Sequence, residues 1–258
     1  MRDERTEATS HGQYVETSDE FTRKRQGWRT SLAADEGLRE SAVQLQVAAD
    51  EHHYGYQWEW AGVPIIRLAD DIMLAQELFW SYRPQRVIET GVARGGSMIL
   101  DASLMSLAGE EPAVLGIDIC IYAHTHTALN AHPLARGITL LEADSTSTTA
   151  SQHAEAFLDA CDRAVVILDS NHTHDHVLAE LRALAPLLPV GGFVLVADTL
   201  VEEFPDGHYA NRPWGPGNNP MTAVRQFLAE DKRFALANDW ARRALVSEFR
   251  DGILQRVS

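Results

Sequence analysis

The chain has 258 residues, 45% of them hydrophobic, which suits one large α/β domain or one domain with an added arm. Its 22 Lys and Arg residues stand against 37 Asp and Glu residues, and the net charge of −15 disfavours nucleic acid and anionic membranes as partners. No stretch has the length and apolarity of a membrane-spanning helix, and the N-terminus lacks the apolar core of a signal peptide. We therefore expect a cytoplasmic protein, with Cys120 and Cys161 as buried free thiols.

The N-terminal part differs in composition from the rest. Residues 1–30 are polar and indicate a mobile or partner-clasping arm, and residues 35–51 have a helical pattern. The aromatic run from Tyr54 to Pro64 fits a pocket wall, an oligomer interface or plain packing. Residues 69–82 are predicted to form an amphipathic helix that leads into a sheet.

Apolar runs then alternate with helical patterns, which is typical of parallel strands joined by crossover helices. The expected strands are Val87–Thr90, Ala113–Asp118, Ile138–Glu142, Ala164–Asp169 and Phe193–Asp198, and the expected helices are Ser97–Leu107, 149–160 and His174–Leu187. After them come a loop with the composition of a lid at Pro205–Pro220, a helix at Thr222–Glu230, and two antiparallel closing strands at Arg233–Trp240 and Gly252–Val257.

These elements predict an α/β fold with a mostly parallel, seven-stranded sheet and helices on both faces. We place the main domain at residues 69–258, and an N-terminal arm with a helical and aromatic segment at residues 1–68.

The segment from Arg86 to Ser97 joins the first strand to its helix. Gly91 can take a tight turn, and Gly95 and Gly96 let the backbone come close to a ligand. Glu89 would repel a pyrophosphate, but it suits a ribose or a cation. The spacing Glu-x-Gly-x-x-x-Gly therefore favours S-adenosylmethionine (SAM), with its sulfonium and α-ammonium, over a dinucleotide, for which Gly-x-Gly-x-x-Gly is expected. A glycine-rich turn without a ligand is the alternative.

Acids follow the predicted strands at their carboxyl ends, where open α/β sheets bind ligands. Asp118 is expected to hold ribose hydroxyls, in either a NAD or a SAM protein. Asp144, followed by Ser145, is expected beside the adenine, and a helix N-cap is the alternative. Asp169 and Asp198 end adjacent strands, and such a pair is electrostatically costly unless a cation such as Mg²⁺ binds to it. The alternative has one acid capping a helix and the other facing water.

Three histidines lie in the segment from Asp169 to His176. Their spacing, His-x-His-Asp-His, is one residue short of the metallo-hydrolase pattern, which argues against a zinc site. Side chains that simply face solvent are the plain alternative. We interpret His172 or His174 as the base that takes a proton from a substrate hydroxyl.

Together these motifs resemble the cephalosporin hydroxylase / rhamnosyl O-methyltransferase family over roughly residues 50–257. The resemblance lies in Tyr54-Gly-Tyr-Gln-Trp-Glu-Trp60, Val87–Ser97, Leu141–Ser145, Leu168–His172, Val196-Ala-Asp-Thr199 and Arg212–Pro220. It implies a class I SAM-dependent methyltransferase fold, with a metal at Asp169 and Asp198. It also implies a SAM site that we place at Glu89, Gly91, Arg94, Gly95, Ser97, Asp118, Asp144 and Ser145.

Two positions depart from the family pattern. Many relatives carry Glu-Asp where this chain has Ala197 and Asp198, so that one metal ligand is lost or replaced by Asn171, His172 or water. Related sugar methyltransferases also carry a second acid at the position of Asn171, and an amide cannot act as a base. His172 is therefore our candidate base.

The predicted function is metal-dependent O-methylation of a deoxysugar hydroxyl, with SAM as donor and a TDP-rhamnose-type nucleotide sugar, methylated at its 3′-OH in antibiotic biosynthesis, as acceptor. Asp169 would hold the Mg²⁺ that orients the hydroxyl, and Arg94, Arg212 or Arg225 would hold the diphosphate. The polar arm and the aromatic segment also predict a homo-oligomer. The alternatives are a nicotinamide-dependent oxidoreductase on the same sheet and a non-catalytic SAM-fold partner of a hydroxylase.

Overall fold

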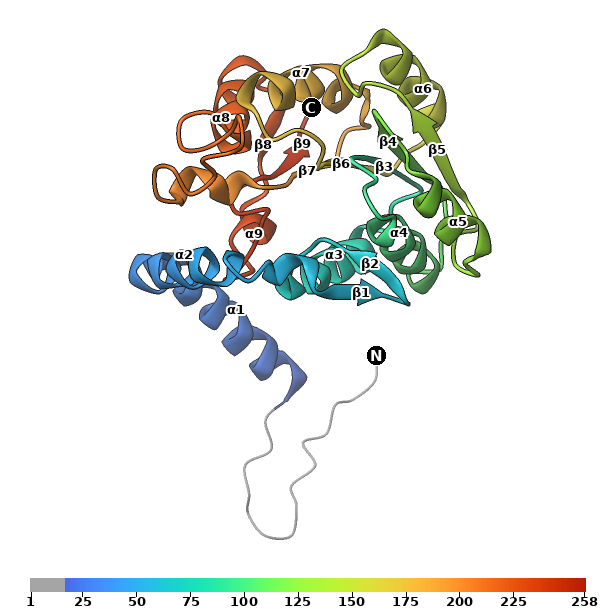
Figure 1. Ribbon diagram of the computed structural model, residues 1–258. Coiled ribbons are helices and arrows are strands. Elements are labelled where there is room, and N and C mark those ends of the chain that lie inside the picture. The colour runs from blue at the N-terminus through green and yellow to red at the C-terminus, as the bar shows by residue number, and fades with distance from the viewer. Residues whose placement is uncertain (1–16) are drawn as a thin grey trace.

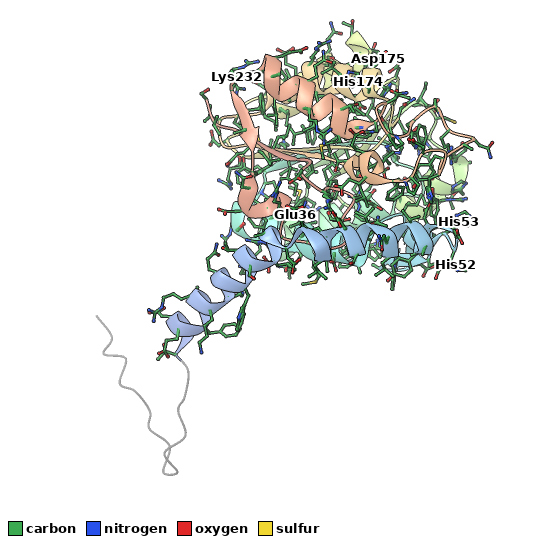
Figure 2. All side chains as sticks on the ribbon, turned by 90° about the vertical axis from the view of Figure 1, so that its left-hand side faces the viewer. Glu36, His52, His53, His174, Asp175 and Lys232 are labelled. Atoms are coloured by element: carbon green, nitrogen blue, oxygen red, sulfur yellow. The ribbon has the colours of Figure 1, made fainter. Side chains whose placement is uncertain are left out.

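The computed structural model describes residues 17–258, so the first 16 residues of the predicted arm lie outside the described part. From residue 17 the arm is helical: α1 spans Ser18–Ala34 and begins with a capping box between Thr17 and Glu20. It extends away from the body and buries none of its residues (Figures 1 and 2). The next helix, α2 (Glu36–Asp50), lies along the body, with His52 and His53 just past its C-terminal end (Figure 2).

The seven-stranded sheet has the order β5-β4-β3-β6-β7-β9-β8, which confirms the predicted mostly parallel sheet. Its strands are β3 (Arg86–Thr90), β4 (Val114–Asp118), β5 (Ile138–Glu142), β6 (Ala164–Leu168), β7 (Phe193–Val196), β8 (Phe234–Leu236) and β9 (Ile253–Arg256). The first five run parallel, whereas β9 pairs antiparallel with both β7 and β8. Strand β8 is shorter than the predicted strand Arg233–Trp240, because the chain turns at Ala237 into the short helix α9 (Asn238–Ala241).

Helices cover both faces of the sheet, and Figure 1 shows them as two layers. One layer holds α6 (Thr148–Leu158), α7 (His174–Leu184) and α8 (Pro220–Glu230), and the other holds α3 (Ala69–Tyr82) and α4 (Gly96–Leu107). Alternate strand residues serve the two layers: Val165 and Ile167 pack with α3 and α4, whereas Val166 and Leu168 pack with α6 and α7. Burial on both faces explains why the strands are continuous apolar runs.

Short elements escaped the sequence prediction. The hairpin of β1 (Trp58–Trp60) and β2 (Val63–Ile65) and the helix α5 (Ala123–Ala131) are too short, or too weakly patterned, for periodicity to reveal them. Single 3₁₀ turns form at η1 (Tyr54–Tyr56), η2 (Ala185–Leu187) and η3 (Thr199–Glu203). The predicted burial of both cysteines is wrong for Cys120, which is exposed in the connection after β4, and Cys161 is half-buried. None of the helices between residues 17 and 258 is long and apolar enough to cross a bilayer.

The hairpin is fixed to the sheet domain by a close backbone contact. Gly96 begins α4, and a Cβ atom at this position would lie 2.3 Å from the carbonyl oxygen of Pro64 in β2. Only a residue without a side chain lets the two segments approach so closely. This contact holds residues 58–65 against the carboxyl-end edge of the sheet.

We predict that Gly96→Ala lowers the free energy of unfolding by about 1–3 kcal/mol, because the methyl group overpacks this contact. The melting temperature should fall by roughly 2–10 °C in a thermal scan. Gly37→Ala in α2 is the matched control, since its Cβ would meet only Asp35 Oδ1 at 3.7 Å. Equal melting temperatures for the two variants would contradict the packing argument.

Candidate active site

The carboxyl ends of β3, β6 and β7 open into a cavity of about 830 Å³. The loop from Gly91 to Ser97 forms one wall, and Asp169, His172 and Asp198 lie in its floor. Residues 46–68 of the N-terminal segment and residues 208–214 of the predicted lid loop complete the enclosure. The site therefore needs segments that precede and follow the parallel strands in the sequence.

The glycine loop is shaped by steric limits and by one carboxylate. Gly91 has φ +89°, and a Cβ there would lie 2.0 Å from the carbonyl oxygen of Asp169, so only glycine fits between the two strand ends. Asp118 Oδ2 accepts hydrogen bonds from the backbone N–H groups of Val92 (2.8 Å) and Ala93 (3.3 Å). Asp118 Oδ1 accepts from Cys120 N–H, at 3.0 Å. Asp118 thus holds the loop in place.

Asp169, His172 and Asp198 form a group whose ligand atoms lie within 4.8 Å of one another. His172 Nε2 is 3.1 Å from Asp198 Oδ2. Strand β7 ends at Val196, two residues before the predicted end at Asp198. Asp198 itself has φ +55°, and this left-handed backbone turns its carboxylate toward Asp169 and His172. Two carboxylates and an imidazole in this arrangement can hold a divalent cation or receive a proton.

Asn171 serves the backbone in this structure. Its Oδ1 accepts hydrogen bonds from Thr173 N–H (3.0 Å) and Thr173 Oγ1 (2.8 Å) just before α7. His174, the other histidine proposed as a base, begins α7 and bonds to α8 instead, with Thr222 Oγ1 at 2.8 Å and Gln226 Oε1 at 3.0 Å. These contacts leave His172 as the candidate base.

The negative charges of the site are poorly compensated by protein alone. Burial raises the pKa of the Asp169 carboxyl to about 6, with Arg67 opposing this rise and Asp198 adding to it. Burial, Asp198 and Asp71 raise the pKa of Glu248, which also lines the cavity, well above its ordinary value. A cation bound here would relieve this repulsion, so the residues present fit a divalent metal.

Glu89 lies behind the cavity wall and is fully buried. Arg67 Nη2 donates to Glu89 Oε1 at 3.2 Å and to Asp169 Oδ2 at 3.1 Å. Burial together with the neighbouring Asp101 raises the pKa of Glu89 well above its ordinary value. Neither Glu89 Oε2 nor Asp101 Oδ2 has a hydrogen-bond partner among residues 17–258, and two buried carboxyls side by side favour a proton on one of them.

Asp144 and Ser145 stabilise the turn after β5. The side chain of Asp144 accepts from Thr146 N–H (2.9 Å) and Thr146 Oγ1 (2.7 Å), whereas Ser147 caps α6, so the N-cap alternative does not hold for Asp144. Ser145 Oγ lies 3.1 Å from His176 Nε2.

His176 connects this turn to the loop after β6. Its Nε2 is also 3.1 Å from Ser170 Oγ and 3.5 Å from Glu180 Oε1, and Glu180 is fully buried. The hydrogen-bonding carboxylate of Glu180 raises the pKa of His176 above its ordinary value, although partial burial opposes this.

The predicted residues therefore fall into two groups. Gly91, Arg94, Gly95, Ser97, Asp169, His172 and Asp198 line the cavity, whereas Glu89, Asp118, Asp144, Ser145 and Asn171 are outside its lining. Sequence reasoning missed Arg67, Glu248 and Trp214, whose ring meets the His172 ring edge to face at 4.9 Å. The one usable signal was an arginine inside the apolar run Val63-Pro-Ile-Ile-Arg67.

Solved structures with the same architecture support the assignment of the fold. An apo structure of CmcI-N160 matches with a TM-score of 0.57 and 21% identity, over 79% of this chain and 77% of that one. A structure of CmcI-D160 in a Mg–SAM form matches with a TM-score of 0.56 and 21% identity, over 79% and 78%. The fold is that of the class I SAM-dependent methyltransferases.

The sequence gives the family. Residues 52–257 match the family model "Rhamnosyl O-methyltransferase/CmcI". Rhamnosyl O-methyltransferase of Mycobacterium tuberculosis (strain H37Rv) is 30% identical over 193 residues, 70% of this chain and 74% of that protein, and the Mycobacterium leprae enzyme is 30% identical over 190 residues, 70% and 78%. The chain belongs to the Rhamnosyl O-methyltransferase/CmcI family and is accordingly a SAM-dependent O-methyltransferase.

The His176–Glu180 pair predicts a pH dependence of stability. Because the folded state raises the pKa of His176, the stability of the pair is fully present below the unfolded value of about 6.5 and is lost as the pH rises through the folded value. We therefore compare the free energies of unfolding of the wild type and His176→Gln. Their difference should be largest near pH 6 and should shrink by about 1 kcal/mol toward pH 8.5.

Urea unfolding between pH 6 and pH 8.5 measures this difference. Glu180→Gln retains the acceptor for Ser170 Oγ, 2.7 Å away in the wild type, but removes the charge, so that it should abolish the pH-dependent part. A difference between wild type and His176→Gln that is constant with pH would rule out the linkage.

Proposed function

We propose that this protein transfers the methyl group of SAM to a sugar hydroxyl, with Mg²⁺ bound at Asp169 and Asp198. The observation that carries the proposal is the meeting of these two carboxylates with His172 beside the glycine loop, in one cavity. Membership of an O-methyltransferase family favours this reading over an oxidoreductase. The mycobacterial relatives are named rhamnosyl O-methyltransferases, and the CmcI structure in a Mg–SAM form has a similar fold.

The proposed SAM site is the wall from Gly91 to Ser97, with Arg94 at its rim. Asp118 supports this wall from behind, and Asp144 and Ser145 shape the turn beyond β5. The carboxylates of the floor also favour a cofactor that carries a sulfonium charge. Glu89 acts from behind the wall rather than by contact with SAM, because it is fully buried.

The chain's own residues divide the chemistry. Two carboxylates suit Mg²⁺, which prefers oxygen ligands, and this leaves the imidazole of His172 to accept the proton of the attacking hydroxyl. Bound Mg²⁺ would orient the sugar hydroxyls and lower their pKa. Asp198, 3.1 Å from His172 Nε2, would stabilise the protonated imidazole, and Trp214 packs against the ring and limits its rotation. Much of the rate would come from this positioning.

The acceptor we propose is a TDP-rhamnose-type nucleotide sugar, methylated at its 3′-OH. The motifs also resemble those of the TDP-rhamnose 3′-O-methyltransferase of calicheamicin biosynthesis, and we propose an antibiotic pathway as the setting. Arg94 and Arg212 line the cavity and are the candidates for binding a diphosphate. Arg225 is a weaker candidate because it pairs with Glu202 at 2.8 Å, outside the cavity lining.

Removal of metal is the first prediction for this function. Purified protein should transfer labelled methyl groups from SAM to TDP-rhamnose, EDTA should abolish the transfer, and added Mg²⁺ should restore it. Turnover that persists after the metal has been stripped would refute the role of Mg²⁺. Absence of transfer to any sugar, with SAM still bound, would favour a non-catalytic partner.

Two substitutions separate the metal site from the base. His172→Ala should lower kcat on the order of 10²–10⁴-fold, because the general base is lost, and should keep the affinity for Mg²⁺. Asp198→Asn should lower both kcat and the affinity for Mg²⁺. Isothermal calorimetry with Mg²⁺ and steady-state kinetics measure the two effects, and loss of Mg²⁺ binding in His172→Ala would instead make His172 a ligand.

We also propose that α1 packs against a second copy of the chain. It carries Phe21 and Trp28 with 45% and 58% of their surfaces exposed, and it buries no residue against its own body. A helix without such packing is marginally stable in water, so a partner surface is needed. The double variant Phe21→Ser/Trp28→Ser should lower the molar mass in light scattering, whereas Leu107→Ser, exposed on α4, should keep it. Equal molar masses of the wild type and the double variant would refute the contact between α1 and a second copy.

A further inference from the structure

Arg67 occupies an unusual position for a charged residue. It follows β2 and precedes α3, so it belongs to none of the strands that build the site. Its side chain is only 4% exposed, its backbone N–H donates to Gly55 O at 3.0 Å, and its guanidinium lies 4.9 Å from the centre of the Phe249 ring. Residues on either side of it, Ile66 and Leu68, line the cavity, but Arg67 itself is behind the wall.

One nitrogen of this guanidinium serves two carboxylates on adjacent strands. Nη2 donates to Glu89 Oε1 and to Asp169 Oδ2, and β3 and β6 pair so that Thr90 faces Leu168. Asp169 Oδ1 accepts no hydrogen bond from residues 17–258 and is left for a ligand in the cavity. Arg67 therefore occupies one carboxylate oxygen of Asp169 and leaves the other available to a ligand.

The other branch leads to the glycine loop. Ser97 lines the cavity in the first turn of α4, and hydrogen bonding by its side chain lowers the pKa of Glu89. The contacts thus form a chain from Ser97 through Glu89 and Arg67 to Asp169. Each end of the chain touches one of the two proposed ligand sites, and its centre touches neither.

We propose that Arg67 is a positioning residue that orients Asp169 for the divalent cation and, through Glu89, Ser97 for SAM. This inference rests on the proposed function, since it assigns Arg67 a part in both of its ligand sites. The inference also distinguishes a positioning role of Arg67 from a purely electrostatic effect of its charge. Loss of a positive charge next to Asp169 would, by Coulomb's law alone, strengthen the binding of a cation, whereas loss of positioning would weaken it.

Arg67→Met tests the sign of this effect. We expect its affinity for Mn²⁺, a spin probe for the metal site, to fall by about tenfold or more, as measured by electron paramagnetic resonance on metal-free protein without turnover. We expect its affinity for S-adenosylhomocysteine, measured by calorimetry, to fall by about tenfold as well. Arg67→Lys, which retains a donor but not the planar fork, should recover part of both affinities.

Arg163→Met is the matched control, because this arginine precedes the opposite end of β6, forms an ion pair with Glu110 at 3.1 Å and is remote from the cavity lining. It should bind both ligands as the wild type does. Unchanged or stronger Mn²⁺ binding by a folded Arg67→Met would overturn the inference. If Arg67→Met does not fold, Arg67→Lys decides: wild-type affinity for either ligand would overturn the inference. A wild type that binds neither ligand would instead refute the proposed function.

Discussion

The structure depends on the balance between a cluster of carboxylates at the strand ends and the buried guanidinium of Arg67. Glu89, Asp169 and Asp198 end or follow three neighbouring strands, and Arg67 compensates the first two. Buried charges in such numbers are tolerated only when they are paired, protonated or bound to a cation. The protein uses the first two solutions behind the wall and leaves the carboxylates of Asp169 and Asp198 facing the cavity. Binding of a cation would therefore lower the electrostatic free energy of the site.

The order of the sheet explains why these acids meet. In the order β4-β3-β6-β7, strands that are distant in the sequence become neighbours, and their carboxyl ends share one edge. Gly91 lets the end of β3 approach the backbone of Asp169, because a side chain at that position would collide with its carbonyl group. The same steric argument applies to Gly96 against Pro64, which brings the hairpin, and with it Arg67, to the same edge. Glycine positions therefore set the distances between the charged groups.

Periodicity and strand-end rules were sufficient for the sheet, the glycine loop and the pairing of Asp169 with Asp198, because each of these follows from local pattern and from general α/β topology. They were insufficient where a side chain acts through long-range packing. Glu89 was expected at the ligand and is instead behind the wall, since alternate residues of β3 face opposite layers and Glu89 points toward α4 and Arg67. Arg67 could not be assigned because the short hairpin that brings it to the site has only three residues in each strand. His172 and His174 could not be separated until the start of α7 was known.

Packing explains why a small apolar residue suits position 197, just before Asp198. Ala197 is 1% exposed and lies in the hydrophobic cluster shared with α3 and α4, so a carboxylate in the same orientation would be desolvated without a partner. The left-handed backbone at Asp198 turns the next side chain the other way, toward His172. A divalent cation here would meet two carboxylates and a neighbouring imidazole.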